Sequence, residues 1–135
     1  LLDDPSLIEG AVEECLRVES PLQIGNRQAA TDFTFGDHRI SKGTYIHTSI
    51  AGANRDPSVF ADPHKFDIER KNNKHIAFIT GIHVCLGATL ARMEGRIALG
   101  KLLTRFPNMQ RDGDAERLPL ARFRGFTRLP VKLNP

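Results

Sequence analysis

The sequence predicts an α+β fold with two main helices, small hairpins and one long irregular loop. Two segments carry apolar residues at three- and four-residue spacing, which indicates amphipathic helices. Between them lie short runs of β-forming residues separated by glycine-containing pairs, as in small hairpins. The third observation is the stretch 51–84, which holds Asp-Pro and Asn-Asn pairs and has little periodicity. Irregular stretches of this length are unusual in compact domains unless they serve a function.

The first predicted helix spans residues 6–18. Pro5 and Ser6 suit the start of a helix, and apolar residues follow at helical spacing until Pro21 prevents continuation. Three β-type runs follow, at residues 22–24, 33–35 and 45–50. The runs are too short for a large sheet, so we expect small hairpins.

The second predicted helix begins after Cys85 and stops before Pro107. Its apolar residues form one broad face, which contains Leu86, Leu90, Met93, Ile97, Leu99, Leu102, Leu103 and Phe106. The tail from Gln110 alternates short apolar runs with glycine and proline, which predicts one more hairpin. This tail is rich in arginine, a pattern we interpret as a solvated face, with a nucleic-acid surface as the alternative.

Composition places the chain among ordinary globular proteins. It has 135 residues, of which 40% are hydrophobic and 26% charged, and its formal net charge is +3. That surplus is too small to indicate a nucleic-acid or membrane partner by itself. No apolar run approaches the roughly 20 residues that cross a bilayer. We therefore expect neither partner.

Cys15 and Cys85 are the only cysteines, so a dense disulfide framework is excluded and at most one disulfide is open. Without a signal peptide at the start, a cytoplasmic location is expected. The first residue is Leu1, not Met, and the helical pattern begins almost at once. We expect that the N-terminal part of a longer protein is missing from this segment.

The residues with the clearest chemical potential are those from Phe78 to Gly87, which lead into the second helix. Cys85 is expected where that helix begins, and the unpaired N–H groups and helix dipole there favour a thiolate. Gly81 and Gly87 allow sharp turns or the close approach of a flat partner. The alternative is a small buried cysteine between two turn glycines.

This block resembles the haem-binding signature of the cytochrome P450 family, Phe-x-x-Gly-x-x-x-Cys-x-Gly. Phe78, Gly81, Cys85 and Gly87 match it. The resemblance implies that the Cys85 thiolate is the axial ligand of haem iron. His83 matches the basic position that contacts a haem propionate in the family.

Further segments resemble the family in the same order. Glu14 and Arg17 match its Glu-x-x-Arg motif, and a spacing of three places them on one helix face. The third member of the family's structural triad is an arginine of the irregular stretch, which implies Arg70 within residues 66–70. The alternative for Glu14 and Arg17 is a solvated surface salt bridge. The resemblance covers nearly the whole chain and implies the C-terminal segment of the mainly α-helical P450 fold.

The resemblance also implies a cofactor and an activity. Haem b would be held by Cys85, with Arg27 and His83 at its propionates and Phe78 packed near the ring, and no other catalytic residue is expected in this segment. Arg27 alternatively carries an ordinary surface charge. Thiolate ligation favours O–O cleavage, the basis of substrate hydroxylation by a haem-thiolate monooxygenase. Such activity requires the full-length context, so we expect residues 1–135 alone to be inactive.

Two departures from the family pattern are expected to matter. The family has a small residue after the signature phenylalanine, whereas this chain has Ile79, a β-branched residue that tolerates positive φ poorly. We expect a distorted loop or an altered haem contact. The family's distal half, with most substrate contacts, is expected to be absent here. The alternative function is therefore a truncated, non-catalytic remnant that binds no haem and self-associates through its exposed apolar face.

Partner predictions follow from the same resemblance. A ferredoxin or similar redox partner is expected at the proximal face near the Cys85 loop. Arg92 and Arg96 are candidate contacts for it, and the alternative for both, which the pattern favours, is an ordinary solvated charge. A small-molecule substrate is expected only with the missing half, and a homo-oligomer is a further expectation. Outside the family, the alternative is that His83 and Cys85 belong to a metal site, but zinc needs about four ligands and the two cysteines lie 70 positions apart.

Overall fold

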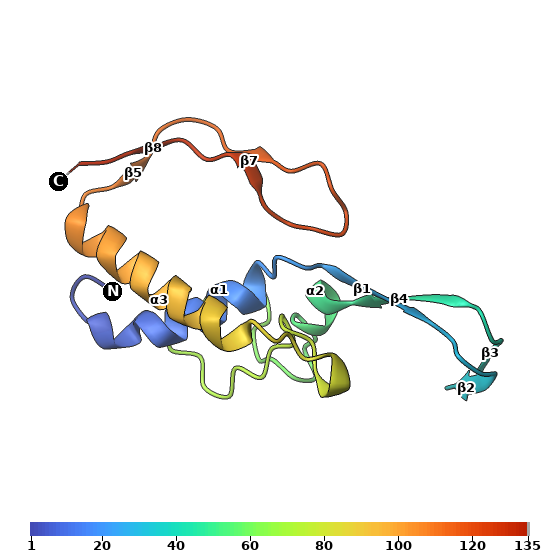
Figure 1. Cartoon of the computed structure of the whole chain (residues 1–135). Coiled ribbons are helices and arrows are strands. Elements are labelled where there is room, and N and C mark those ends of the chain that lie inside the picture. The colour runs from blue at the N-terminus through green and yellow to red at the C-terminus, as the bar shows by residue number, and fades with distance from the viewer. Residues whose placement is uncertain (135) are drawn as a thin grey trace.

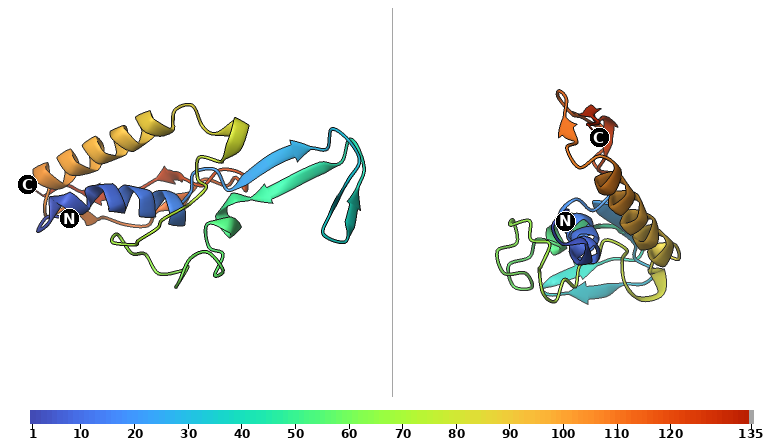
Figure 2. Two further views of the ribbon diagram at one scale, coloured as in Figure 1. Left: turned by 90° about the horizontal axis from the view of Figure 1, so that it is seen from below. Right: turned by 90° about the vertical axis from the view of Figure 1, so that its left-hand side faces the viewer.

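The computed structural model describes residues 1–134, and two helices form its centre. Helix α1 (Ile8–Val18) packs against helix α3 (Ala88–Arg105), and the two run in opposite directions (Figure 1, Figure 2). A β-ribbon extends from one end of this pair, and the C-terminal ribbon doubles back from the end of α3 to the residues that follow α1. The predicted α+β class holds for the segment.

Helix α1 begins with a single 3-10 turn, η1 (Pro5–Leu7), which Asp4 caps by accepting a hydrogen bond from the Ser6 N–H. It ends where the Glu19 N–H donates to the carbonyl of Cys15. The helix predicted over residues 6–18 is therefore confirmed, with its first turn wound more tightly than an α-helix. Its buried face contains apolar and charged side chains together: Ala11, Val12, Glu14 and Arg17.

The first β-ribbon pairs β1 (Ile24–Gln28) antiparallel with β4 (Tyr45–Ser49). At its tip lies a small hairpin, β2 (Phe33–Phe35) with β3 (His38–Ile40) (Figure 1). The strand predicted at residues 22–24 is wrong in position, because the ladder begins at Ile24. Leu22 instead forms an isolated bridge with Phe123 of the C-terminal ribbon.

A short helix that the sequence pattern did not predict, α2 (Ile50–Ala53), follows the ribbon and is capped by the hydroxyl of Ser49. Residues 54–80 then form no helix or strand, as expected for the irregular loop. We call this segment the meander. It leads to a 3-10 turn, η2 (Gly81–His83), and from there to α3.

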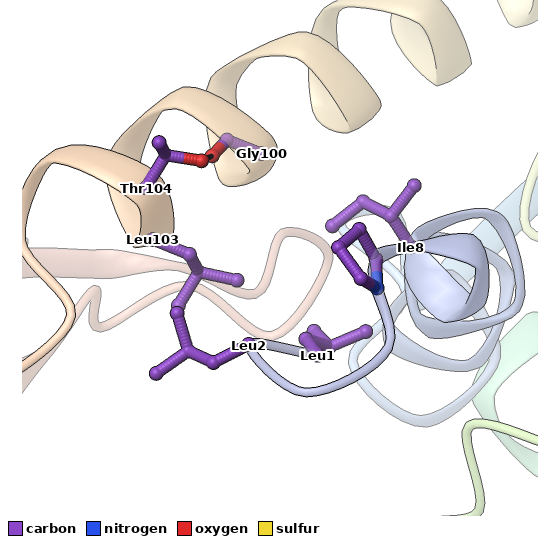
Figure 3. A pocket seen from close by; sticks show the side chains of 7 residues that line it. Leu1, Leu2, Ile8, Gly100, Leu103 and Thr104 are labelled. Carbon is purple, nitrogen blue, oxygen red and sulfur yellow. Dashed lines mark hydrogen bonds between the residues drawn. The ribbon is translucent and has the colours of Figure 1, made fainter.

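The predicted second helix is present, but it begins at Ala88 rather than directly after Cys85. Its expected apolar face does not enter a core: Leu90 is 52% exposed, Met93 50% and Ile97 51%. At the opposite end of α3 from Cys85, Leu103 and Gly100 join Leu1 and Ile8 around an apolar pocket of about 160 Å³ (Figure 3).

The tail forms one long irregular ribbon, which agrees with the predicted hairpin. It pairs β5 (Gln110–Arg111) with β8 (Val131–Lys132) and β6 (Glu116–Arg117) with β7 (Phe126–Arg128). Backbone hydrogen bonds from Gln23 N–H to Arg122 O and from Arg124 N–H to Pro21 O attach its turn to the body.

The core is small and unusually polar. Its buried apolar residues are Ala11, Val12, Ala29, Ile50, Phe60 and Ala77. The largest fully buried side chains are instead those of Arg17, Glu14 and Asn54. Because buried charges are tolerated only when they are paired and hydrogen-bonded, this centre depends on a completed polar network.

Candidate functional site

Glu14 and Arg17 form a buried ion pair on the inner face of α1. The Arg17 Nε donates to Glu14 Oε2 at 2.8 Å, and its Nη2 donates to Oε1 at 2.8 Å. Both side chains are 0% exposed, so the alternative of a solvated surface salt bridge is wrong. Arg17 also donates to three carbonyls of the meander region, those of Asn54, Pro63 and Lys65.

The structure brings Arg70 to the same carboxylate. Its Nε donates to Glu14 Oε1 at 3.2 Å, while its two Nη atoms donate to the carbonyls of Ala61, Asp62 and Lys65. The Asp67 N–H and the Asn73 side-chain amide complete the shell of Glu14 at 2.9 and 3.0 Å. One carboxylate on α1 thereby fixes the course of the meander.

The charge state of Glu14 follows from two opposed effects. Burial raises its pKa, but the hydrogen bonds from Arg17, the Asp67 N–H and Arg70 together outweigh burial and hold the pKa below its usual value. Glu14 is therefore ionised at neutral pH and available to both guanidinium groups.

Cys85 lies in a loop closed by backbone hydrogen bonds. Its N–H donates to Phe78 O at 2.9 Å, the Val84 N–H donates to Gly81 O at 3.1 Å, and the Ala88 N–H donates to Cys85 O at 3.1 Å. Cys85 thus precedes α3 by one turn instead of starting it. Its side chain is exposed, so the alternative of a small buried cysteine is wrong.

Ile79 has the positive φ that a β-branched residue tolerates poorly. Its φ is 59°, and Gly81 two residues later has a φ of 70°. For a β-branched residue the left-handed region is a real strain, typically about 1–2 kcal/mol. The loop keeps its left-handed turn at Ile79 despite that strain, and the Ile79 N–H donates to Ile76 O at 2.8 Å.

The surroundings of Cys85 are apolar and uncovered. Ile82 is 97% exposed, Val84 58% and Leu86 102%. A Cβ atom placed on Gly87 would lie 3.9 Å from Cys85 Sγ, so the glycine keeps the space beside the sulfur open. An exposed thiol within a group of exposed apolar side chains suits a flat apolar partner that takes one sulfur ligand.

The predicted cationic partners lie on two different elements. His83 is exposed in η2, and Arg27 is partly buried on β1, where its guanidinium donates to Asn26 O at 2.8 Å. Within residues 1–134 neither side chain pairs with a carboxylate. Both remain available to an anion.

A second, partly buried ionic cluster was not found from the sequence. Glu13 of α1 binds Arg92 of α3 and His75 of the meander, and Arg92 covers the ring of Phe78. The one feature of the sequence that could have indicated this cluster is Glu13 itself. Because it directly precedes Glu14 on α1, its side chain must point to another side of the helix. Arg92 and Arg96, predicted as redox-partner contacts, are both ion-paired inside the chain, Arg96 with Glu9.

Comparison with known proteins identifies the family. The family model for cytochrome P450 matches residues 3–134. The chain belongs to the cytochrome P450 family. Cytochrome P450 107B1 of Saccharopolyspora erythraea is 45% identical over 98% of this chain and 34% of its own length. The biotin biosynthesis cytochrome P450 of Bacillus subtilis is 45% identical over 97% of the chain and 33% of its own.

Solved structures agree with the sequence relatives. P450BioI, crystallised in complex with an acyl carrier protein carrying hexadec-9Z-enoic acid, superposes with a TM-score of 0.95 at 43% identity. That match covers 99% of this chain and 35% of the other. The fold is therefore that of a part of a cytochrome P450, and the chain spans about a third of the length of the curated relatives it matches.

The structure also bears on the zinc, membrane, disulfide and nucleic-acid alternatives. Among residues 1–134 no three metal-ligating side chains cluster, and no helix is long and apolar enough to cross a membrane. Cys15 and Cys85 are both free thiols. In the tail, Arg117 and Arg124 bind Glu19, so these arginines do not form a free basic surface.

Proposed function

We propose that this chain forms the proximal side of the haem site of a cytochrome P450 monooxygenase, with Cys85 as the axial iron ligand. One observation carries the proposal: the thiol of Cys85 is exposed on a loop that backbone hydrogen bonds fix to Phe78 O, at the centre of an uncovered apolar surface.

The residues present fit haem b. The donor set is a single soft sulfur, Gly87 leaves the space next to it open, and Ile82, Val84 and Leu86 offer apolar contacts. Bound there, a thiolate-ligated haem supplies the oxygen activation that substrate hydroxylation requires. The carbonyl of Phe78 stabilises the loop by accepting the Cys85 N–H.

His83 and Arg27 are proposed to bind the two propionates. Haem carries these carboxylates at one edge, and cations without carboxylate partners are suited to receive them. Arg27 can present two parallel N–H groups to a carboxylate, which makes it the stronger of the two sites.

The Glu14, Arg17 and Arg70 network is proposed as the structural triad that supports this site. Asn54 connects it to the loop, because its carbonyl accepts from Arg17 Nη1 while its Oδ1 accepts from the Ile76 N–H at 2.7 Å. The N–H of Ile79 in turn donates to Ile76 O, which leads directly to the Cys85 loop.

Substrates and partners are proposed for the protein as a whole. A ferredoxin or similar redox partner would dock at the face near the Cys85 loop, and a small-molecule substrate would be held largely by residues outside this segment. Because P450BioI was crystallised with an acyl carrier protein, a substrate attached to a carrier protein is one class of substrate to test with the whole protein.

The test compares two exposed thiols in the same chain. Haem is added to the purified protein, which is reduced and exposed to carbon monoxide, and the absorption spectrum is recorded. We expect a strongly red-shifted Soret band that Cys85→Ala abolishes and Cys15→Ala, the matched control, retains. A thiolate spectrum that survives Cys85→Ala contradicts the ligand assignment.

A second outcome would favour the other candidate function. Leu90, Met93 and Ile97 expose the apolar face of α3, which suits self-association if nothing covers it. No haem spectrum in the unmodified protein, combined with a defined dimer or larger species in solution, would indicate a remnant that no longer performs the family's chemistry.

A further inference from the structure

Adjacent carboxylates of α1 serve different parts of the molecule. Glu14 faces the meander, whereas Glu13, one residue earlier, faces α3. Glu13 Oε1 accepts from Arg92 Nε at 2.7 Å, and its Oε2 accepts from Arg92 Nη2 at 3.1 Å. This two-point geometry fixes the plane of the guanidinium as well as its position.

His75 supports the same carboxylate from the meander. Its side chain is 1% exposed, its Nδ1 accepts from the Ala77 N–H at 3.2 Å, and its Nε2 lies 3.0 Å from Glu13 Oε2. Because Nδ1 is an acceptor, the neutral ring carries its proton on Nε2 and donates it to Glu13. Glu13 is thus held from both sides, by α3 and by the meander.

The guanidinium that Glu13 orients reaches the Cys85 loop. The Cζ atom of Arg92 lies 4.7 Å from the centroid of the Phe78 ring, within the range of a cation–π contact. The His75 ring is tilted against the same ring at a centroid distance of 6.5 Å. The carbonyl of Phe78 accepts the Cys85 N–H at 2.9 Å. A continuous path of contacts therefore joins Glu13 to the backbone of Cys85.

We propose that Arg92, oriented by Glu13, is a positioning residue that fixes the Cys85 loop through the ring of Phe78. The inference deepens the proposed function, on which its consequence for haem ligation rests, and it assigns Arg92 a role inside the protein.

The chain contains a matched control. Arg96, one turn further along α3, binds Glu9 of α1 at 2.7 Å and so connects the same two helices. Arg96 makes no ring contact with Phe78 or any other described aromatic side chain. If Arg92 only joined α1 to α3, replacing Arg92 or Arg96 would have the same effect. If Arg92 also positions the Cys85 loop, only its replacement disturbs that loop.

The first measurement needs no haem. Amide hydrogen exchange is followed in haem-free protein for the Cys85 N–H, which reports directly on its bond to Phe78 O. We expect Arg92→Gln to accelerate this exchange about fivefold, the size of one cation–π contact, and Arg96→Gln to leave it within a factor of two. Equal acceleration by both variants would overturn the proposal.

A double substitution tests the route. If Arg92 acts through the ring, Arg92→Gln has no further effect on Cys85 exchange in a Phe78→Leu background, whereas Phe78→Tyr preserves its full effect. An undiminished effect of Arg92→Gln without the ring contradicts the route.

The haem-bound form gives the second readout. In mild urea, Arg92→Gln is expected to speed the loss of the thiolate-type carbon monoxide spectrum about fivefold relative to Arg96→Gln. A protein that never shows this spectrum refutes the proposed function alone, because hydrogen exchange in the haem-free protein still decides the role of Arg92.

Discussion

Arg17 provides the most demanding test of how this small structure is held together. Its guanidinium is fully buried and donates five hydrogen bonds, two to Glu14 and three to the carbonyls of Asn54, Pro63 and Lys65. Its plane also lies over the Phe60 ring, with Cζ 5.2 Å from the centroid. No single replacement reproduces this set of contacts.

The magnitude follows from those contacts. Arg17→Ala takes this donor from the carbonyls of Asn54 and Pro63 and leaves the Lys65 carbonyl with Arg70 alone. It also removes the two-point partner of the buried Glu14 carboxylate, and together these losses cost about 5 kcal/mol. That loss equals a large part of the 5–15 kcal/mol by which domains are typically stable, so we expect insoluble protein. Arg17→Lys keeps the charge but offers three donors in place of five, and we expect a loss of about 3–5 kcal/mol.

Urea unfolding followed by circular dichroism measures the effect of Arg17→Lys. The matched control is Arg39→Lys, whose ion pair with Asp32 is 3.3 Å long and largely exposed, and which should leave the midpoint unchanged. A soluble Arg17→Ala protein with the native midpoint, or an Arg17→Lys protein indistinguishable from Arg39→Lys, would refute the claim that this network holds the meander on α1.

Further expectations concern the loop and the second cluster. We expect the Ile79→Gly protein to be more stable to urea than the Ile79→Ala protein by about 1 kcal/mol, because φ at this position is 59°. The opposite order would contradict backbone strain at Ile79. Gly81→Ala should cost about 1 kcal/mol from its φ of 70° alone, since a Cβ meets open space; an unchanged midpoint would argue against this. Burial lowers the pKa of His75, so stability should fall as pH drops below about 6.5 and the unfolded chain binds the extra proton. His75→Gln, which keeps a donor for Glu13, should flatten this part of the pH profile, and an unchanged slope would exclude His75 as its source.

Local patterns predicted those features that depend on neighbouring residues. Proline and capping residues set the start of α1 and the end of α3 almost as expected, because helix limits follow from backbone bonds within a turn or two. The spacing of Glu14 and Arg17 placed them on one face, where the structure joins them at 2.8 Å. The cost of Ile79 was also visible in advance, since it belongs to the residue's own backbone.

Local patterns failed where distant segments decide the outcome. The ladder of β1 begins at Ile24 because Leu22 bridges to Phe123, about a hundred residues away. Arg92 and Arg96 looked like solvent-facing contacts, since nothing in α3 itself indicates that Glu13 and Glu9 of α1 lie opposite them. The apolar face of α3 was predicted, but its surroundings were not: among residues 1–134, Leu90 and Met93 are about half exposed.

By itself the sequence determined the two main helices, the Cys85 loop, the Glu14 and Arg17 pair and, through the resemblance they carry, the cytochrome P450 family and Arg70 as the third member of the triad. Only the tertiary structure decided that Glu13 holds Arg92 over Phe78, and that Cys85 stands exposed among uncovered apolar side chains. The reason is physical: backbone preferences act over a few residues, whereas the buried pair of Glu14 and Arg70 joins groups 56 positions apart, and only folding brings those together.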